Sequence, residues 1–182
     1  MIKNKYKVID DYVVLYCDRK NNEIFEVYID LDDLKIIDRL DYKIYVKLFK
    51  RSRSYYAGIT LYEKDEIEKT YVKCVLLHRF LLDIKDPKVK VDHINHNTLN
   101  NRRTNLRTCN NSNNNRHREG KNSNNKSGYR NVCWSKRDNQ WMVQLMVDGK
   151  NTRLGYFDDI DEAGKFAEDM RAKYYGEFAG EN

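Results

Sequence analysis

The chain has 182 residues, of which 34% are charged and 40% apolar, and its formal net charge at pH 7 is +6. This length fits one or two small domains rather than one large core. The longest apolar run, residues 12–17, is far shorter than the roughly 18 residues that a membrane-spanning helix needs. The four cysteines lie far apart, so we expect reduced thiols in a cytoplasmic protein and no zinc site.

The positive charge is concentrated in the middle of the chain. Residues 91–155 carry 12 Lys and Arg against 4 Asp and Glu, a net of +8, and residues 156–182 carry 3 against 8, a net of −5. A basic band attracts polyanions through counterion release and through contacts to phosphate oxygens. A solvated face that balances the acidic end explains the charge equally well, so charge alone leaves both explanations open.

Residues 1–71 are predicted to form a β-rich region. Residues 12–16 and 24–29 are rich in β-branched and aromatic side chains, and the turn residues between them predict a hairpin. The apolar spacing in residues 32–40 fits a short helix. Further strands are predicted over three segments of the same character: 44–49, 55–62 and 70–77.

Side chains that suggest chemistry begin at the pair Asp92-His93. Asn105 lies 13 residues after Asp92, and Asn114 lies nine residues further on. These residues at this spacing resemble the HNH nuclease family, in its variant with asparagine at the last position. The resemblance covers residues 72–118 and implies a β-hairpin packed on a helix around one divalent metal ion, Mg²⁺ or alternatively Mn²⁺.

The resemblance also implies how these side chains would act in phosphodiester hydrolysis. Asp92 and Asn114 would hold the metal through hard oxygen atoms. His93 would be the catalytic base that takes a proton from water, and Asn105 would brace the loop that positions it. Because neighbouring residues of a strand point to opposite sides, we expect a local distortion that brings Asp92 and His93 toward one phosphate.

Other polar side chains of this segment are judged by their surroundings. His78 lies among apolar residues and is predicted to be a packing residue. His117, one helical turn after Asn114, is the best substitute ligand if Asn114 does not bind the metal. Three arginines are expected to contact phosphates beside the site, although at least one of them has the alternative of only neutralising the loop: Arg102, Arg103 and Arg107.

Residues 119–126 are predicted to be an extended, mobile linker, because they contain no apolar side chain to bury. They end a wider region, residues 95–125, in which 13 of 31 residues are asparagine. Asparagine favours turns and helix caps and can donate to phosphates and base edges. A domain boundary is therefore predicted at this linker.

Residues 127–182 are predicted to form three antiparallel strands backed by one amphipathic helix. Asp148-Gly149 is a strong hairpin turn, and the spacing of Asp159 and Glu162 is typical of a helix N-terminus. The predicted fold class of the whole chain is therefore α+β: a β-rich region, a ββα-metal core, and a three-stranded sheet packed on one helix.

Several short motifs in residues 127–182 occur together: Tyr129-Arg130-x-Val132, Trp141, Leu154-Gly155-x-Phe157, Glu162-Ala163 and Gly176-x-Phe178-Ala179. Together they resemble the DNA-binding domain of plant ethylene-response factors, the apetala-two family. The resemblance implies that the sheet, rather than the helix, lies in the DNA major groove, which admits a β-ribbon. It assigns seven side chains to the DNA-facing side: Arg130, Trp134, Lys136, Arg137, Gln144, Met146 and Arg153.

A nuclease core followed by such a sheet domain resembles free-standing, homing-type endonucleases of phage and bacterial genomes. The implied protein is a metal-dependent DNA endonuclease that acts on double-stranded DNA as a monomer or weak dimer, without membrane or zinc. Two alternatives stay open. One is a non-catalytic, sequence-specific DNA-binding regulator, and the other is an RNA-binding protein that uses the asparagine-rich loops.

Overall fold

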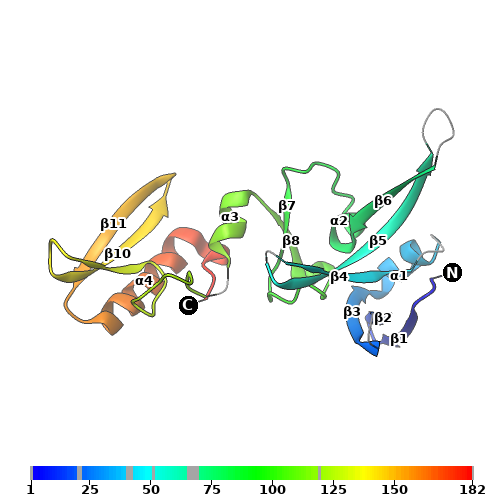
Figure 1. Cartoon of the computed structure of the whole chain (residues 1–182), viewed down its shortest axis with the longest axis horizontal. Helices are drawn as coiled ribbons and strands as arrows, with labels where there is room; N and C mark the ends of the chain where they lie inside the picture. Colours follow the sequence, from blue (N-terminus) through cyan, green and yellow to red (C-terminus); the bar gives the residue numbers. More distant parts are fainter. Residues whose placement is uncertain are drawn as a thin grey trace. The chain divides into compact units, whose positions relative to one another are not determined.

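The computed structural model describes residues 2–19, 22–39, 43–50, 52–64, 70–118 and 120–181. The chain forms two compact units, residues 1–109 and 110–182 (Figure 1). Both are built from small antiparallel sheets with helices, so the predicted α+β class is confirmed. In the described part of the chain, no helix is long and apolar enough to cross a membrane.

Three antiparallel strands in the order β1-β2-β3 open the first unit. They are β1 (Lys5–Ile9), β2 (Tyr12–Asp18) and β3 (Ile24–Asp30), followed by helix α1 (Leu31–Asp38). The central strand β2 buries Val13, Leu15 and Cys17 completely, since alternate residues of a strand share one face. The sequence predicts β2, β3 and α1 but misses β1, a strand of five residues whose side chains are mostly exposed.

A second antiparallel sheet packs against the first one (Figure 1). It contains β4 (Tyr45–Phe49), β5 (Ser54–Lys64) and β6 (Thr70–Leu76), and it leads into helix α2 (Leu77–Leu81). One hydrophobic core joins Ile29 and Ile37 of the first sheet region to Ile59 of β5 and Leu77 of α2. This core is the platform on which the next segment lies.

The segment with the candidate chemistry is a two-stranded hairpin on this platform. Its elements are β7 (Lys90–His93), the short 3-10 helix η2 (Arg103–Asn105) and β8 (Leu106–Cys109). The loop between the strands docks on β3 through backbone hydrogen bonds from Tyr28 N to Leu99 O, 3.0 Å, and from Asn101 N to Tyr28 O, 2.8 Å. The hairpin is therefore anchored to a strand more than 60 residues upstream.

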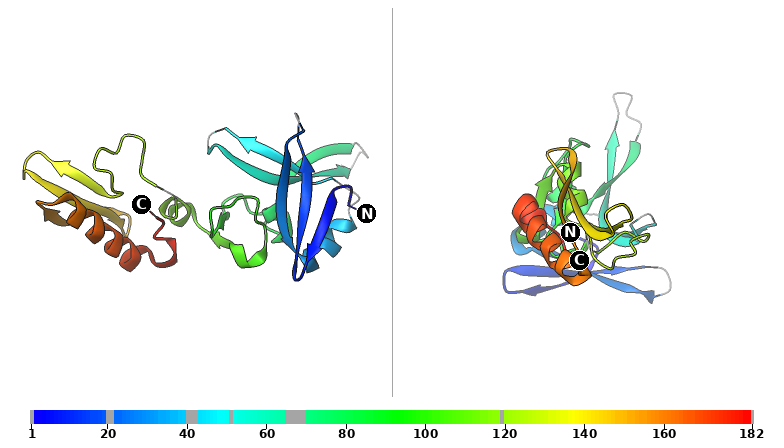
Figure 2. Two further views of the ribbon diagram at one scale, coloured as in Figure 1. Left: turned by 90° about the horizontal axis from the view of Figure 1, so that it is seen from below. Right: turned by 90° about the vertical axis from the view of Figure 1, so that its left-hand side faces the viewer.

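The second unit is a three-stranded sheet in the order β11-β10-β9, covered on one face by a long helix (Figure 2). Its elements are α3 (Asn111–Arg116), β9 (Val132–Ser135), β10 (Gln140–Val147), β11 (Lys150–Phe157), α4 (Ile160–Tyr175) and η3 (Gly176–Phe178). Val143 and Leu145 of β10 and Ala163 and Ala167 of α4 are fully buried between sheet and helix. The predicted sheet and helix are thus confirmed, and Asp159 caps α4 by accepting hydrogen bonds from two backbone N–H groups.

The segment between α3 and β9 differs from the extended linker predicted at residues 119–126. Glu119 lies outside the described residues, but residues 120–127 fold back onto the second unit. Asn125 accepts a hydrogen bond from Gly128 N and donates to Tyr129 O, both at 2.9 Å, and buried Ser127 donates to Val132 O at 2.8 Å. This segment has no apolar side chains to bury, and polar side chains fix its position. The division between the two units falls after Cys109.

Candidate functional site

The hairpin pairs Asp92 of β7 directly with Arg107 of β8, so both side chains lie on one face. Arg107 Nε donates to Asp92 Oδ2 at 2.8 Å, and Asp92 is only 8% exposed. A charge-assisted bond of this length neutralises a carboxylate that burial would otherwise destabilise. Arg107, which the sequence assigns to phosphate, is thus engaged with the predicted metal ligand itself.

His93 points to the other side of the hairpin, into the first unit. Its imidazole is 4% exposed and lies edge-on to His78 of α2 at 5.1 Å and to Tyr56 of β5 at 6.1 Å between ring centroids. The strand pairing is regular through His93. The expected distortion that would bring Asp92 and His93 toward one phosphate is therefore not present, and the packing role predicted for His78 is confirmed.

Burial controls the charge of both histidines. Desolvation lowers the pKa of His93 to about 4, against the opposing effects of the Asp92 carboxylate and Asn101. Desolvation, then His93 and Arg79, lowers the pKa of His78 to about 3. Within the described part of the chain, His93 Nε2 is buried without a well-formed hydrogen bond. The imidazole is consequently neutral at pH 7, with a ring nitrogen that no other group holds firmly.

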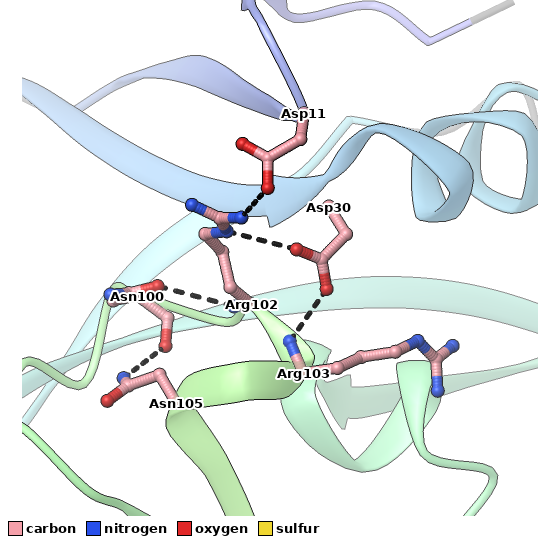
Figure 3. Close-up of polar contacts among 6 residues, drawn as sticks. All are labelled: Asp11, Asp30, Asn100, Arg102, Arg103 and Asn105. Atoms are coloured by element: carbon pink, nitrogen blue, oxygen red, sulfur yellow. Dashed lines mark hydrogen bonds and ion pairs between the residues drawn. The ribbon is translucent and has the colours of Figure 1, made fainter.

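Asn105 fastens the loop that follows His93. Its backbone carbonyl accepts from Ile94 N at 2.9 Å, and its side-chain oxygen accepts from Asn95 N at 2.9 Å. Its amide donates to Asn100 O at 2.8 Å (Figure 3). The side chain is buried, and by these three bonds the residue connects both ends and the middle of the loop. This geometry suits a bracing residue.

Arg102 and Arg103 bind carboxylates of the N-terminal sheet region, and Figure 3 shows those of Arg102, Asp11 and Asp30. Arg102 contacts Asp11 and donates from Nε to Asp30 Oδ1 at 3.0 Å. Arg103 donates to Asp33 Oδ1 at 2.6 Å, and the Asp33 side chain is 1% exposed. A carboxylate buried to that degree needs a cation. In place of the predicted phosphate contacts, Arg102, Arg103 and Arg107 therefore all form ion pairs within the chain.

The predicted second metal ligand belongs to a different unit from the first. Asn114 lies half-buried in α3, and His117, the substitute ligand, is buried after it, both in the second unit. Asp92, His93 and Asn105 are in the first unit. Among the described residues, no three His, Cys, Asp or Glu side chains gather as metal ligands do. The predicted metal ligands, Asp92 and Asn114, are one carboxylate and one amide oxygen, so they do not form a group of this kind.

In the second unit, strand alternation separates the sheet into a face packed on α4 and an outer face. Gln144 and Arg153 pair across β10 and β11 on the outer face, as do Met146 and Asn151. Arg153 and Met146 are exposed, as are Lys136 and Arg137 in the turn between β9 and β10. These positions agree with the outward-facing side that the sequence predicts.

Two of the predicted DNA-facing residues are placed differently. Arg130 is 3% exposed and donates to the carbonyls of Arg116 at 2.8 Å, Arg118 at 2.9 Å and Glu181 at 2.5 Å, so its guanidinium is engaged inside the second unit rather than exposed on the sheet. The N–H groups of its planar guanidinium donate to backbone carbonyls that lie at or beyond the ends of helices. Trp134 pairs with Trp141 and shares its face with buried Val132, the face toward α4, although it remains 46% exposed at the sheet edge.

No family model, curated protein or solved structure matches this chain. Any function must therefore be inferred from the side chains and surfaces of the chain itself.

A groove of about 860 Å³ lies within the second unit, and sequence reasoning missed it. On one side are residues of the segment 118–127, and on the other are β9, β10 residues Trp141, Gln144 and Met146, Asn151 of β11 and Tyr175 at the end of α4. The lining combines basic, amide and aromatic side chains, among them Arg118, Asn124, Lys126, Lys136, Gln144 and Trp134. No local signal in the sequence predicts this groove, because it depends on the folding of the asparagine-rich segment back against the sheet.

Proposed function

We propose that this protein is a metal-dependent DNA endonuclease that hydrolyses phosphodiester bonds. The observation that carries the proposal is the Asp92-His93 pair at the end of β7, beside a loop fastened by Asn105. Burial keeps His93 neutral at pH 7 and leaves its Nε2 atom loosely held. A neutral imidazole is the protonation state that can accept a proton from an attacking water.

Asp92 would hold the cation through its carboxylate, and the amide oxygen of Asn114 is the second ligand that the sequence predicts, because Mg²⁺ and Mn²⁺ prefer such hard oxygen ligands. When bound, the cation would supply positive charge at the scissile phosphate. Asp92 already lies beside a positive charge, the Arg107 guanidinium, at 2.8 Å. Release of Asp92 would leave Arg107 able to bind a phosphate oxygen, which is the task that the sequence assigns to it.

The second unit would place the nuclease on DNA through the outer face of its sheet. Gln144 and Arg153 lie opposite each other on that face, and both side chains can bind base edges in the major groove. Lys136 and Arg137, in the adjoining turn, would contact phosphates. A tethered binding module raises the effective concentration of DNA at a site that itself recognises little sequence.

The test is the nicking of supercoiled plasmid with and without Mg²⁺. His93→Ala should lower the rate by at least about 100-fold, the contribution typical of a general base, while DNA binding stays near that of the parent. His93→Gln, which keeps a polar side chain of similar size, serves as the control for folding and should be equally inactive. Nicking by His93→Ala at the parental rate would refute the catalytic assignment.

A non-catalytic, sequence-specific DNA-binding regulator is the second candidate. The inward orientation of His93 and the Asp92–Arg107 ion pair favour it, because both keep the predicted site closed to a phosphate. Such a protein would bind DNA equally well in EDTA and would not nick plasmid with Mg²⁺ or Mn²⁺. The same assay therefore separates the two candidates.

A further inference from the structure

We propose that residues 120–127, called the wall below, clamp one sugar–phosphate strand of duplex DNA against the outer face of the C-terminal sheet. The proposal rests on the proposed function in one respect, that DNA is the ligand, and it names the element that grips the backbone. Hydrogen bonds hold the wall against the second unit. Asn125 donates to Tyr129 O, Ser127 donates to Val132 O at the start of β9, and Lys121 Nζ donates to Gly128 O at 3.2 Å.

The groove behind the wall has the charge that a polyanion requires. Arg118, Lys126 and Lys136 line it, and among the lining residues that the structure describes none is an aspartate or glutamate. Within the described part of the chain, neither Lys126 nor Lys136 forms an ion pair with a carboxylate, unlike Arg102 and Arg103 of the first unit. These two lysines thus carry charge that no described carboxylate of this chain balances.

The amide side chains of the groove suit a phosphate backbone as well. Asn122 and Asn124 in the wall and Asn151 in β11 are exposed, and amide N–H groups commonly donate to phosphate and sugar oxygens. The amide of Asn125, in contrast, holds the wall itself. Asn125 thus holds the wall in place, whereas Asn122 and Asn124 present exposed side chains at the groove.

The size and position of the groove select one strand as its occupant. About 860 Å³ lies within the range of roughly 300–1,000 Å³ that accommodates a ligand of a few hundred daltons, too small for both strands of a duplex. A sheet inserted in the major groove has a sugar–phosphate backbone beside each edge. The groove runs along β9, an edge strand of this sheet, which is where one of those backbones would lie.

The experiment measures how salt affects the binding of the full-length protein to a labelled DNA duplex, by fluorescence anisotropy in EDTA between about 50 and about 200 mM salt. Removal of one lysine that binds a phosphate should reduce the slope of log K against log[salt] by about 0.9. Lys126→Ala and Lys136→Ala should each show this reduction. Over this fourfold range of salt, the parent's advantage over each variant should therefore shrink about 3.5-fold.

Lys165→Ala is the matched control, because Lys165 is an exposed lysine of α4, the helix on the other face of the sheet. It should keep the parental slope. If the parent binds and nicks DNA but Lys126→Ala and Lys136→Ala keep its slope of log K against log[salt], the clamp is refuted and the proposed function stays intact. A reduction confined to single-stranded DNA, or tighter binding of RNA than of DNA, would also overturn it. Absence of any DNA binding by the parent would overturn both proposals.

Discussion

Arg130 offers the sharpest contrast between a structural and a DNA-binding role. Its guanidinium holds the carbonyls of Arg116, Arg118 and Glu181 at 2.5–2.9 Å, and burial, followed by Arg171 and Arg118, lowers its pKa to about 10. It is still charged at pH 7. Hydrogen bonds from a charged donor contribute about 1.5–3 kcal/mol each, but they share one group and offset its desolvation, so Arg130→Ala should cost about 3 kcal/mol in all.

Tryptophan fluorescence measures this destabilisation selectively, because both tryptophans of the chain, Trp134 and Trp141, lie in the second unit. With a urea m-value of about 1 kcal/mol/M for so small a unit, the midpoint should fall by about 3 M. Arg130→Lys, which keeps the charge but not the planar fork, should lower the midpoint by about half as much and stay folded if the alanine variant does not. Arg137→Ala, at an exposed arginine, should leave the midpoint unchanged.

The structural role of Arg130 would be refuted by one combination of results. If Arg130→Ala kept the parental midpoint and lost DNA affinity with a smaller salt slope, the side chain would contact DNA as the sequence predicts.

Three further predictions concern the stability of the two units. Arg103→Ala deprives the buried Asp33 carboxylate of its cation and should destabilise the first unit by about 2 kcal/mol. The measurement is urea denaturation followed by circular dichroism. The control Asp32→Ala removes an exposed carboxylate and should have no effect. The folded-state pKa values of His78 and His93, about 3 and 4, lie below the usual 6.5 of the unfolded chain. The unfolded chain therefore binds more protons, and the first unit should lose about 2 kcal/mol as pH falls from 6.5 to 5.5 but only about 0.3 kcal/mol from 8 to 7; a flat profile would contradict the burial of these rings. Asn131 has a φ of 65°, which alanine adopts less readily than glycine. Asn131→Ala should therefore lower the free energy of unfolding by about 1 kcal/mol in the tryptophan assay, and Asn131→Gly by less than half of that. Equal destabilisation by the two variants would show that the side-chain bond to Gln144 O matters more than the backbone.

The elements that the sequence predicts well are those with local signals. The alternation along β10, the Asp148-Gly149 turn and the capping residue Asp159 each depend on neighbours within a few positions, and the structure has all three. The same holds for the packing role of His78, which follows from the apolar residues around it.

What the sequence could not predict depends on partners far along the chain. The carboxylates that bind Arg102 and Arg103 lie about 70 or more residues upstream, so nothing near these arginines distinguishes an ion pair from a phosphate contact. Arg130 is similar, since one of its carbonyl partners is 51 residues away. The wall was missed for another reason: its order comes from amide and hydroxyl hydrogen bonds, whereas the prediction weighed only apolar burial.

The anchoring of the β7–β8 hairpin on β3 and α1 limits how this protein can be divided or recombined. A fragment that begins at residue 72 would keep Asp92, His93 and Asn105 but lose the Tyr28 backbone bonds and the aspartates that hold Arg102 and Arg103. The loop would then have to close without its template, and its charges would repel one another. Exchange of the candidate catalytic segment between proteins, by evolution or by design, would therefore succeed only with residues 1–109 carried as one block.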